Sequence, residues 1–270
     1  MIILPYQIIL TVIIGACLAG IACSLIGTFI VRMKLSSLGF CMSHAAFAGS
    51  ALGLVLRINP LMMAILFSIA VALFLGPIVE KAKLHADIIL GIMFSLMLSL
   101  GLIFLNFAPQ TAMSSTAMGI LWGSILGMNT LDIINLTILT SLIIALIILF
   151  SKEFKAIMFN RKMAEASGIN TKPFYYLLLF LTGITVSLSL KLVGGLLVFA
   201  LIVNPTSIVC QFSYDIKKII LFSPLCGVVC CLMGILLSFL FDFPVGSSIA
   251  IFSSIFFGIS VIFSPKRKRG

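Results

Sequence analysis

Charge is scarce in this chain. Asp, Glu, Lys and Arg make up 9% of its 270 residues, whereas 62% are hydrophobic and the mean hydropathy is +1.33. An average soluble domain has about 25% charged residues, and a folded surface in water needs polar cover. This composition excludes a soluble enzyme, a disordered chain and a nucleic-acid-binding protein. It predicts a protein whose main solvent is lipid.

Acidic residues are especially few, and none lies deep inside an apolar segment. The seven are Glu80, Asp87, Asp132, Glu153, Glu165, Asp215 and Asp242. Without a buried carboxylate pair, an aspartyl membrane protease and a proton-coupled carrier are disfavoured. The chain also lacks a GxxxxGK[ST] phosphate loop and a GxSxG nucleophile motif, so it has no P-loop ATP site and no sign of hydrolase chemistry. We expect a protein that is not an enzyme.

Cysteine does not form a disulfide framework here. The seven cysteines are odd in number and lie in or beside apolar runs, where free cysteine behaves as a small hydrophobic residue. We interpret all of them except Cys41 as packing residues.

Nine apolar segments are long enough, or nearly so, to cross a bilayer. They span residues 5–31, 37–56, 60–79, 87–107, 131–150, 173–191, 192–212, 216–241 and 245–263. Strand-like alternation is absent, and a helix satisfies its own backbone hydrogen bonds in lipid. The fold class predicted is an all-α polytopic helical bundle, a single transmembrane domain over residues 1–270. Eight spans remain an alternative, since the sixth and seventh segments are hard to separate.

Basic residues fix the expected orientation. If the N-terminus is outside, only Arg57 and Lys191 of the 17 basic residues face outward, which is a strong positive-inside bias. The basic tail at 264–270 is then cytoplasmic, and the net charge of +10 is a topology signal. With an odd number of spans, the basic residues that flank the first span and those that flank the last span both lie on the cytoplasmic side.

Small residues recur every four positions in the first two spans. Ala16, Gly20, Ser24 and Thr28 form one row, and Ala45, Gly49 and Gly53 form another. Because small residues let helices approach closely in lipid, these rows predict helix–helix seams.

Two segments between spans have structure of their own. The uncharged segment 108–130 contains an apolar stretch at 116–126, too short to cross, that we expect to form a re-entrant or surface helix. In the basic loop 151–172, Asn160 can cap a short helix over 161–167 and Gly168 can end it. The small side chains of that helix suit close contact with another protein; a solvated linker is the alternative.

His44 is the one ionisable side chain well inside a span, and such residues are functional candidates by default. Cys41 lies three residues earlier on the same helical face. Imidazole and thiolate both bind zinc and similar ions. Two ligands are a weak metal signature, so a histidine that only bonds a helix carbonyl remains an alternative.

Five stretches resemble one known family. They are SLGFCMSHAAFAGSALG (37–53), ADIILGI (86–92), RKMAEASGINTK (161–172), GGLLVFALIVNPTSIV (194–209) and FPVGSSIAI (243–251). The chain looks like the membrane permease of ATP-binding-cassette importers for manganese, zinc and iron, and the resemblance covers nearly its whole length.

The resemblance implies a type II importer fold that works as a homodimer in a prokaryotic plasma membrane. Two copies of an ATPase subunit and an extracellular metal-binding protein would complete the complex. No cofactor is bound permanently; the divalent metal is the transported substrate. Glu165, Ala166 and Gly168 match the coupling loop that docks on the ATPase, and His44 matches the metal path.

Phe40 departs from the family pattern. The family usually has Asp four residues before the motif histidine, and here that position is Phe40. Cys41 could act as a softer ligand, which favours zinc over manganese. A permease of the same architecture for a chelated or non-metal substrate is the alternative, and a secondary carrier or intramembrane enzyme is a third hypothesis.

Overall fold

The computed structural model describes residues 6–82, 84–108, 129–194 and 198–265, and every regular element in these ranges is helical. The helices are α1 (Tyr6–Arg32), α2 (Ser36–Leu56), α3 (Pro60–Ala82), α4 (Ala86–Phe107), α7 (Thr130–Leu149), α8 (Ser151–Phe159), α9 (Arg161–Ala166), α10 (Thr171–Val193), α11 (Val198–Phe212), α12 (Ile216–Phe241) and α13 (Val245–Ile262). The predicted all-α bundle is confirmed. The predicted surface helix at 116–126 lies outside the described residues.

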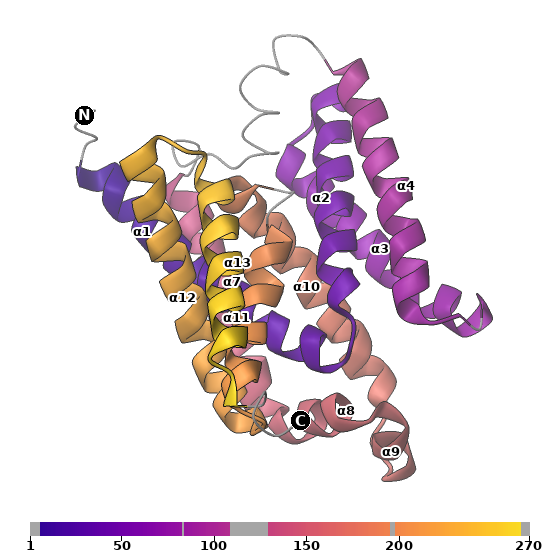
Figure 1. Ribbon diagram of the computed structural model, residues 1–270. Coiled ribbons are helices and arrows are strands. Elements are labelled where there is room, and N and C mark those ends of the chain that lie inside the picture. Colours follow the sequence, from indigo (N-terminus) through magenta and orange to yellow (C-terminus); the bar gives the residue numbers. More distant parts are fainter. Residues whose placement is uncertain (1–5, 83, 109–128, 195–197, 266–270) are drawn as a thin grey trace.

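Eight described helices are long and apolar enough to cross a membrane, and α11 is a shorter apolar helix. Gly194 separates α10 from α11, with a φ of 89° that favours glycine. The sixth and seventh apolar segments are therefore two helices. In Figure 1, α1 begins at the upper end of the bundle and α13 finishes at the lower end.

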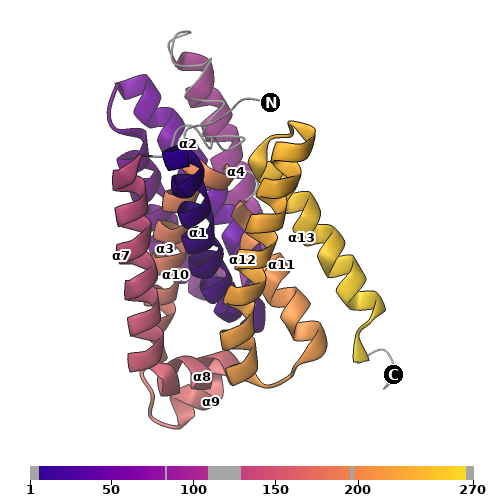
Figure 2. The ribbon, with the colours of Figure 1, turned by 90° about the vertical axis from the view of Figure 1, so that its left-hand side faces the viewer.

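α1 is the central helix of one half of the bundle, packed between α7 and α12 (Figure 2). Its small-residue row makes close contacts: a Cβ placed on Gly20 would lie 2.9 Å from the carbonyl oxygen of Gly227 in α12. A Cβ on Gly53 of α2 would lie 2.8 Å from the Cα of Pro60 in α3. Both predicted seams are confirmed, since only glycine allows these backbones to approach so closely.

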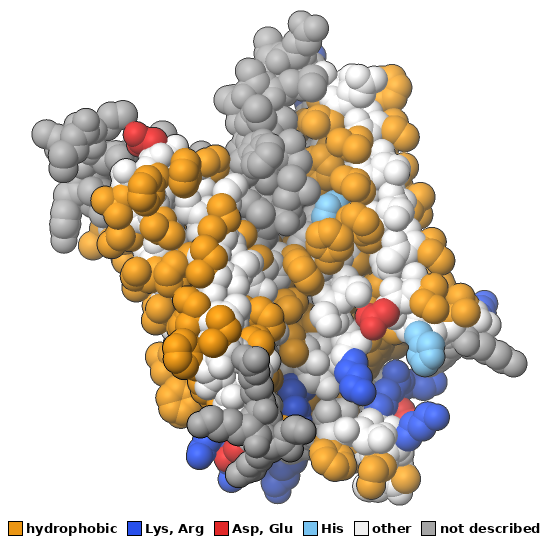
Figure 3. Space-filling model, viewed as in Figure 1, with side chains coloured by type: hydrophobic (Ala, Val, Ile, Leu, Met, Phe, Trp, Pro, Cys, Tyr) orange, Lys and Arg blue, Asp and Glu red, His pale blue; other side chains and the backbone are white. Residues whose placement is uncertain are grey.

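The short helices α8 and α9 form an elbow at the lower end of the bundle in Figures 1 and 2. Lys and Arg side chains gather at the same end (Figure 3). Basic residues thus cluster in space as well as in the loops of the sequence, as a positive-inside protein requires.

Candidate functional site

His44 lies in the middle of α2 and only 2% of its surface is exposed. α2 is the most buried of the eight spans: 78% of the 18-residue stretch that would cross the membrane is buried inside the bundle. Its mean hydropathy of 1.5 is nevertheless the lowest of the eight. The burial follows from its small residues, which let α3 and α4 pack against it. The histidine therefore sits among protein helices and not in the lipid.

Two phenylalanine rings contact His44, and a third packs against one of them. The His44 ring centroid is 4.8 Å from that of Phe40 and 4.6 Å from that of Phe94 in α4. Phe40 also stacks on Phe94 at 4.4 Å and lies 5.1 Å from Phe199 of α11. Edge-to-face and stacked pairs at these distances attract one another, so Phe40 of α2 and Phe94 of α4 orient the imidazole, and Phe199 of α11 supports Phe40.

One hydrogen bond determines the tautomer of His44. Its Nδ1 lies 2.9 Å from the carbonyl oxygen of Phe40, one turn earlier in α2. A carbonyl can only accept, so Nδ1 carries the proton, and in the neutral ring the lone pair is on Nε2. Metal-binding histidines in proteins are commonly held in this way. The hydrogen bond from His44 to a helix carbonyl is thus compatible with a role of its Nε2 as a metal ligand.

Cys41 is fully buried in α2, one turn before His44. The structure describes no hydrogen bond between its thiol and the His44 ring. Across the described part of the chain, no three or more His, Cys, Asp or Glu side chains are grouped so that they could hold a metal ion. The geometry therefore does not form a closed resident metal site of the kind that proteins use for structural zinc.

The second candidate region is the α8–α9 elbow. The Asn160 side chain accepts hydrogen bonds from the backbone N–H of Lys162, at 2.9 Å, and of Met163. This confirms the predicted N-cap. The helix ends at Ala166 rather than at 167, and Gly168 follows with a φ of 83°. Its N–H donates to Glu165 O at 3.0 Å, which closes the turn.

Polar contacts tie α9 to the start of α10. The Arg161 Nε donates to Glu165 Oε1 at 3.2 Å and to Thr171 Oγ1 at 3.1 Å, and the Thr171 hydroxyl donates to the same carboxylate oxygen. The Arg161 guanidinium also lies 4.8 Å from the Tyr175 ring centroid. The hydrogen bond from Thr171, followed by the Arg161 contacts, holds the pKa of the exposed Glu165 carboxyl below its usual value. The elbow is thus a fixed projection, and not a flexible linker.

The elbow exposes apolar and small residues beside its charged ones. Met163 is 58% exposed and Phe159 is 73% exposed, Ala166 and Gly168 are also exposed, and within α9 only Ala164 is buried. Exposed apolar side chains on a rigid projection are typical of a protein-binding surface. Of the predicted coupling residues, Glu165 faces α10, and Ala166 and Gly168 are open to a partner.

The sequence did not predict Phe94 as a neighbour of His44, or Phe199 as a neighbour of Phe40. The only local signal was the four-residue spacing of Phe40 and His44, which places their side chains together on a helix. The contributions of α4 and α11 depend on how the helices pack. The Arg161–Glu165 pair, at the same spacing, could have been found from the sequence.

The comparisons with known proteins define the class: a multi-pass membrane permease of an ATP-binding-cassette transporter. The chain belongs to the ABC 3 transport family, whose model matches residues 5–264. This confirms the resemblance to permeases of ATP-binding-cassette transporters.

Named relatives cover almost the whole chain. The manganese transport system membrane protein MntC of Listeria monocytogenes is 32% identical over 265 residues, 98% of this chain and 93% of the relative. The manganese import system permease protein ScaB of Streptococcus gordonii is 29% identical over 94% of this chain and 91% of the relative. A solved structure, PsaBC from Streptococcus pneumoniae in complex with Fab, has a TM-score of 0.85 and 28% identity over 97% of this chain and 94% of that chain.

Proposed function

We propose that this chain is the membrane permease of an ATP-binding-cassette importer that carries divalent metal ions, namely manganese, zinc or iron. The observation that supports this most is the family match over nearly the whole chain, together with relatives named for manganese transport. His44, held with an unprotonated Nε2 inside the bundle, is the residue that we assign to the ion path.

The His44 position suits passage better than storage. One imidazole nitrogen binds a divalent ion weakly, and a transported ion must leave again. Cys41 is the second candidate ligand, one turn away, and its sulfur prefers softer ions. With Phe40 at the position of the usual carboxylate, the path has less negative charge than is normal in the family. We therefore place zinc ahead of manganese for this chain.

The elbow is the proposed ATPase contact, with Ala166 and Gly168 at the interface and Glu165 fixing the shape of α9. ATP hydrolysis belongs to the partner, in two copies on a permease homodimer, and an extracellular metal-binding protein delivers the ion. The whole chain, residues 1–270, acts as one permease domain with the coupling loop at 151–172 and the basic tail at 264–270. The N-terminus is outside a prokaryotic plasma membrane and the C-terminus is cytoplasmic, because basic residues gather at the elbow end.

One observation favours a second candidate, a chelated or non-metal substrate. Aromatic rings, and not carboxylates, contact His44: Phe40 and Phe94 lie against it and Phe199 packs on Phe40. Rings of this kind suit the organic part of a chelate. This candidate keeps the same architecture and ATPase partner, so transport assays with different substrates separate the two.

The test uses proteoliposomes containing the permease with its ATPase and measures uptake of zinc and manganese. His44→Leu fills most of the space of the ring but offers no ligand atom, and we expect uptake of both ions to fall at least tenfold while the complex assembles normally. His85→Leu is the matched control, since His85 is exposed and its side chain caps nothing. Cys41→Ser should lower zinc uptake more than manganese uptake. Unchanged uptake of every divalent ion in His44→Leu, Cys41→Ser would remove the path assignment and favour the chelate.

A further inference from the structure

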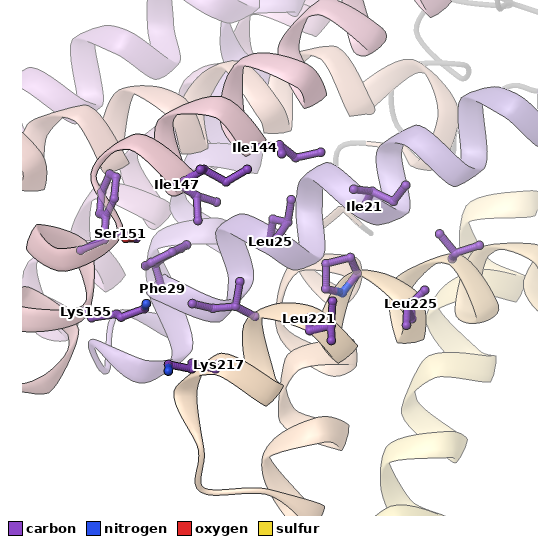
Figure 4. Close-up of a pocket in the computed structure, with 15 residues that line it drawn as sticks. Ile21, Leu25, Phe29, Ile144, Ile147, Ser151, Lys155, Lys217, Leu221 and Leu225 are labelled. Carbon is purple, nitrogen blue, oxygen red and sulfur yellow. The ribbon is translucent and has the colours of Figure 1, made fainter.

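A groove runs along the outside of the bundle where α1, α7, α8 and α12 meet (Figure 4). Its volume is about 670 Å³, within the range of sites that hold small ligands. None of its lining residues belongs to α2, α4 or α11, the helices around His44. The groove is therefore separate from the proposed ion path.

Most of the groove is apolar. Its floor consists of buried side chains such as Leu25, Phe29 and Ile147, which belong to α1 and α7. Its rim includes Ile148, which is 70% exposed, and Leu221, which is 64% exposed. The rim belongs to helices that cross the membrane, so the groove opens toward the lipid and not into a second layer of the described protein.

One end of the groove is basic. Lys155 of α8 and Lys217 of α12 both lie at this end, beside Ser151, and the apolar side chains extend away from them (Figure 4). No ion pair joins either lysine to an acidic side chain in the described part of the chain. Asp215, just before α12, accepts a hydrogen bond from the backbone N–H of Lys217 at 2.9 Å. Two ammonium groups at one mouth favour an anion between them.

The length of the groove matches one leaflet of a bilayer. On α12 it extends from Lys217 to Val228, which is about 17 Å at 1.5 Å per residue. Half of the roughly 30 Å hydrocarbon core is about 15 Å. The lysines thus lie at the level of lipid headgroups while the apolar end reaches the middle of the membrane.

We propose that this groove binds an anionic phospholipid of the leaflet on the elbow side, with an acyl chain along Phe29, Leu25 and Leu221 and the phosphate between Lys155 and Lys217. Basic pockets between helices on the cytoplasmic side are typical of such lipids. A zwitterionic lipid would gain the apolar contacts but less from the lysines, and free phosphate would gain nothing from the apolar wall. Since α8 is the first helix of the elbow, the bound lipid bridges the elbow and α12. The inference does not depend on which ion is carried.

Native mass spectrometry of the purified full chain in detergent tests the headgroup contact, with phosphatidylglycerol and phosphatidylcholine of identical acyl chains as probes. A lysine near the surface contributes about 1 kcal/mol toward an anionic lipid, so losing two corresponds to a loss of roughly 30-fold in affinity. We expect this loss for phosphatidylglycerol in Lys155→Gln, Lys217→Gln. The exposed pair Lys152→Gln, Lys162→Gln, which does not line the groove, should bind as the wild type does.

A second variant tests the apolar wall. Leu221→Trp places a large ring at the exposed rim, and it should lower the affinity for both lipids by at least tenfold. Leu236→Trp, at a 51% exposed position of α12 outside the groove, is the control. Equal binding of the two lipids by the wild type, or unchanged phosphatidylglycerol binding in the Lys155, Lys217 variant, would overturn the headgroup assignment. If Leu221→Trp left lipid binding unchanged and instead weakened ATPase association, the groove would be a protein contact and the proposal would be wrong.

Discussion

Phe40→Asp restores the carboxylate that the family usually has one turn before the histidine, and its consequences can be worked out from the ring contacts. The Phe40 ring packs against His44, Phe94 and Phe199 at centroid distances of 4.8, 4.4 and 5.1 Å. Each aromatic pair contributes about 0.5–1.5 kcal/mol beyond its buried area. Without metal, we therefore expect the substitution to lower the free energy of unfolding by roughly 3 kcal/mol from the three ring pairs, and further through the lost apolar burial.

Added manganese should offset most of the ring-pair part of this loss. A carboxylate at position 40 lies beside His44 on the same face of α2, and together they offer oxygen and nitrogen ligands to one ion. A ligand at 100 times its Kd stabilises the folded state by about 2.7 kcal/mol. In the wild type, a single imidazole nitrogen binds weakly, and the same manganese concentration should change the stability very little.

The assay is thermal unfolding of the purified permease with and without manganese, followed by the ratio of manganese to zinc uptake in the reconstituted complex. Phe40→Asp should gain in Tm with manganese and shift its uptake toward manganese. Phe104→Asp is the control, since Phe104 lies ten residues beyond Phe94 on α4 and packs against a different ring. If manganese failed to raise the Tm of Phe40→Asp above its effect on Phe104→Asp, position 40 would not face the ion path.

Three further predictions concern the elbow and the helix seams. Gly168→Val should cost about 1–2 kcal/mol of backbone strain at its φ of 83°, and it should weaken ATPase association in pull-down experiments. In Gly168→Asn, the asparagine tolerates this conformation and association should be normal. Normal association of the valine variant would refute the coupling assignment. Gly27→Ala should destabilise by about 1–3 kcal/mol, because a Cβ would overlap the carbonyl of Ile202 in α11; Gly91→Ala, where a Cβ meets nothing within 4 Å, is the matched control in the same thermal assay. The pKa of Glu165 is lowered, so the contribution of its carboxylate contacts to the free energy of unfolding is complete above the ordinary carboxyl pKa of 4.5 and is lost as the pH falls through the pKa of the folded state. The Tm difference between wild type and Glu165→Gln should therefore be constant near neutral pH and shrink in acid. A difference that grew in acid would contradict the assigned contacts.

Local features of this protein were predictable from the sequence. Each long helix of the bundle follows from an apolar run, because a backbone in lipid must satisfy its hydrogen bonds within the segment. The α9 cap followed from Asn160 and its end from Gly168, since both act on backbone groups within a few residues. The seams at Gly20 and Gly53 followed from a four-residue spacing of small side chains. His44 was found because an ionisable residue inside a span is rare.

Tertiary structure decided which helices meet. In a membrane both the lipid-facing and the buried sides of a helix are apolar, so hydropathy does not report which side is inside. The most hydrophobic span is the least buried, and the least hydrophobic span is the most buried. α4 has a mean hydropathy of 2.7 with 22% of its membrane-spanning stretch buried, whereas α2 has a mean hydropathy of 1.5 with 78% buried. Consequently the sequence determined the spans, the capped elbow and the position of His44. Only the packing of α4 and α11 around α2 brought Phe94 and Phe199 to Phe40, and only the packing of α8 and α12 against α1 placed two distant lysines at one groove.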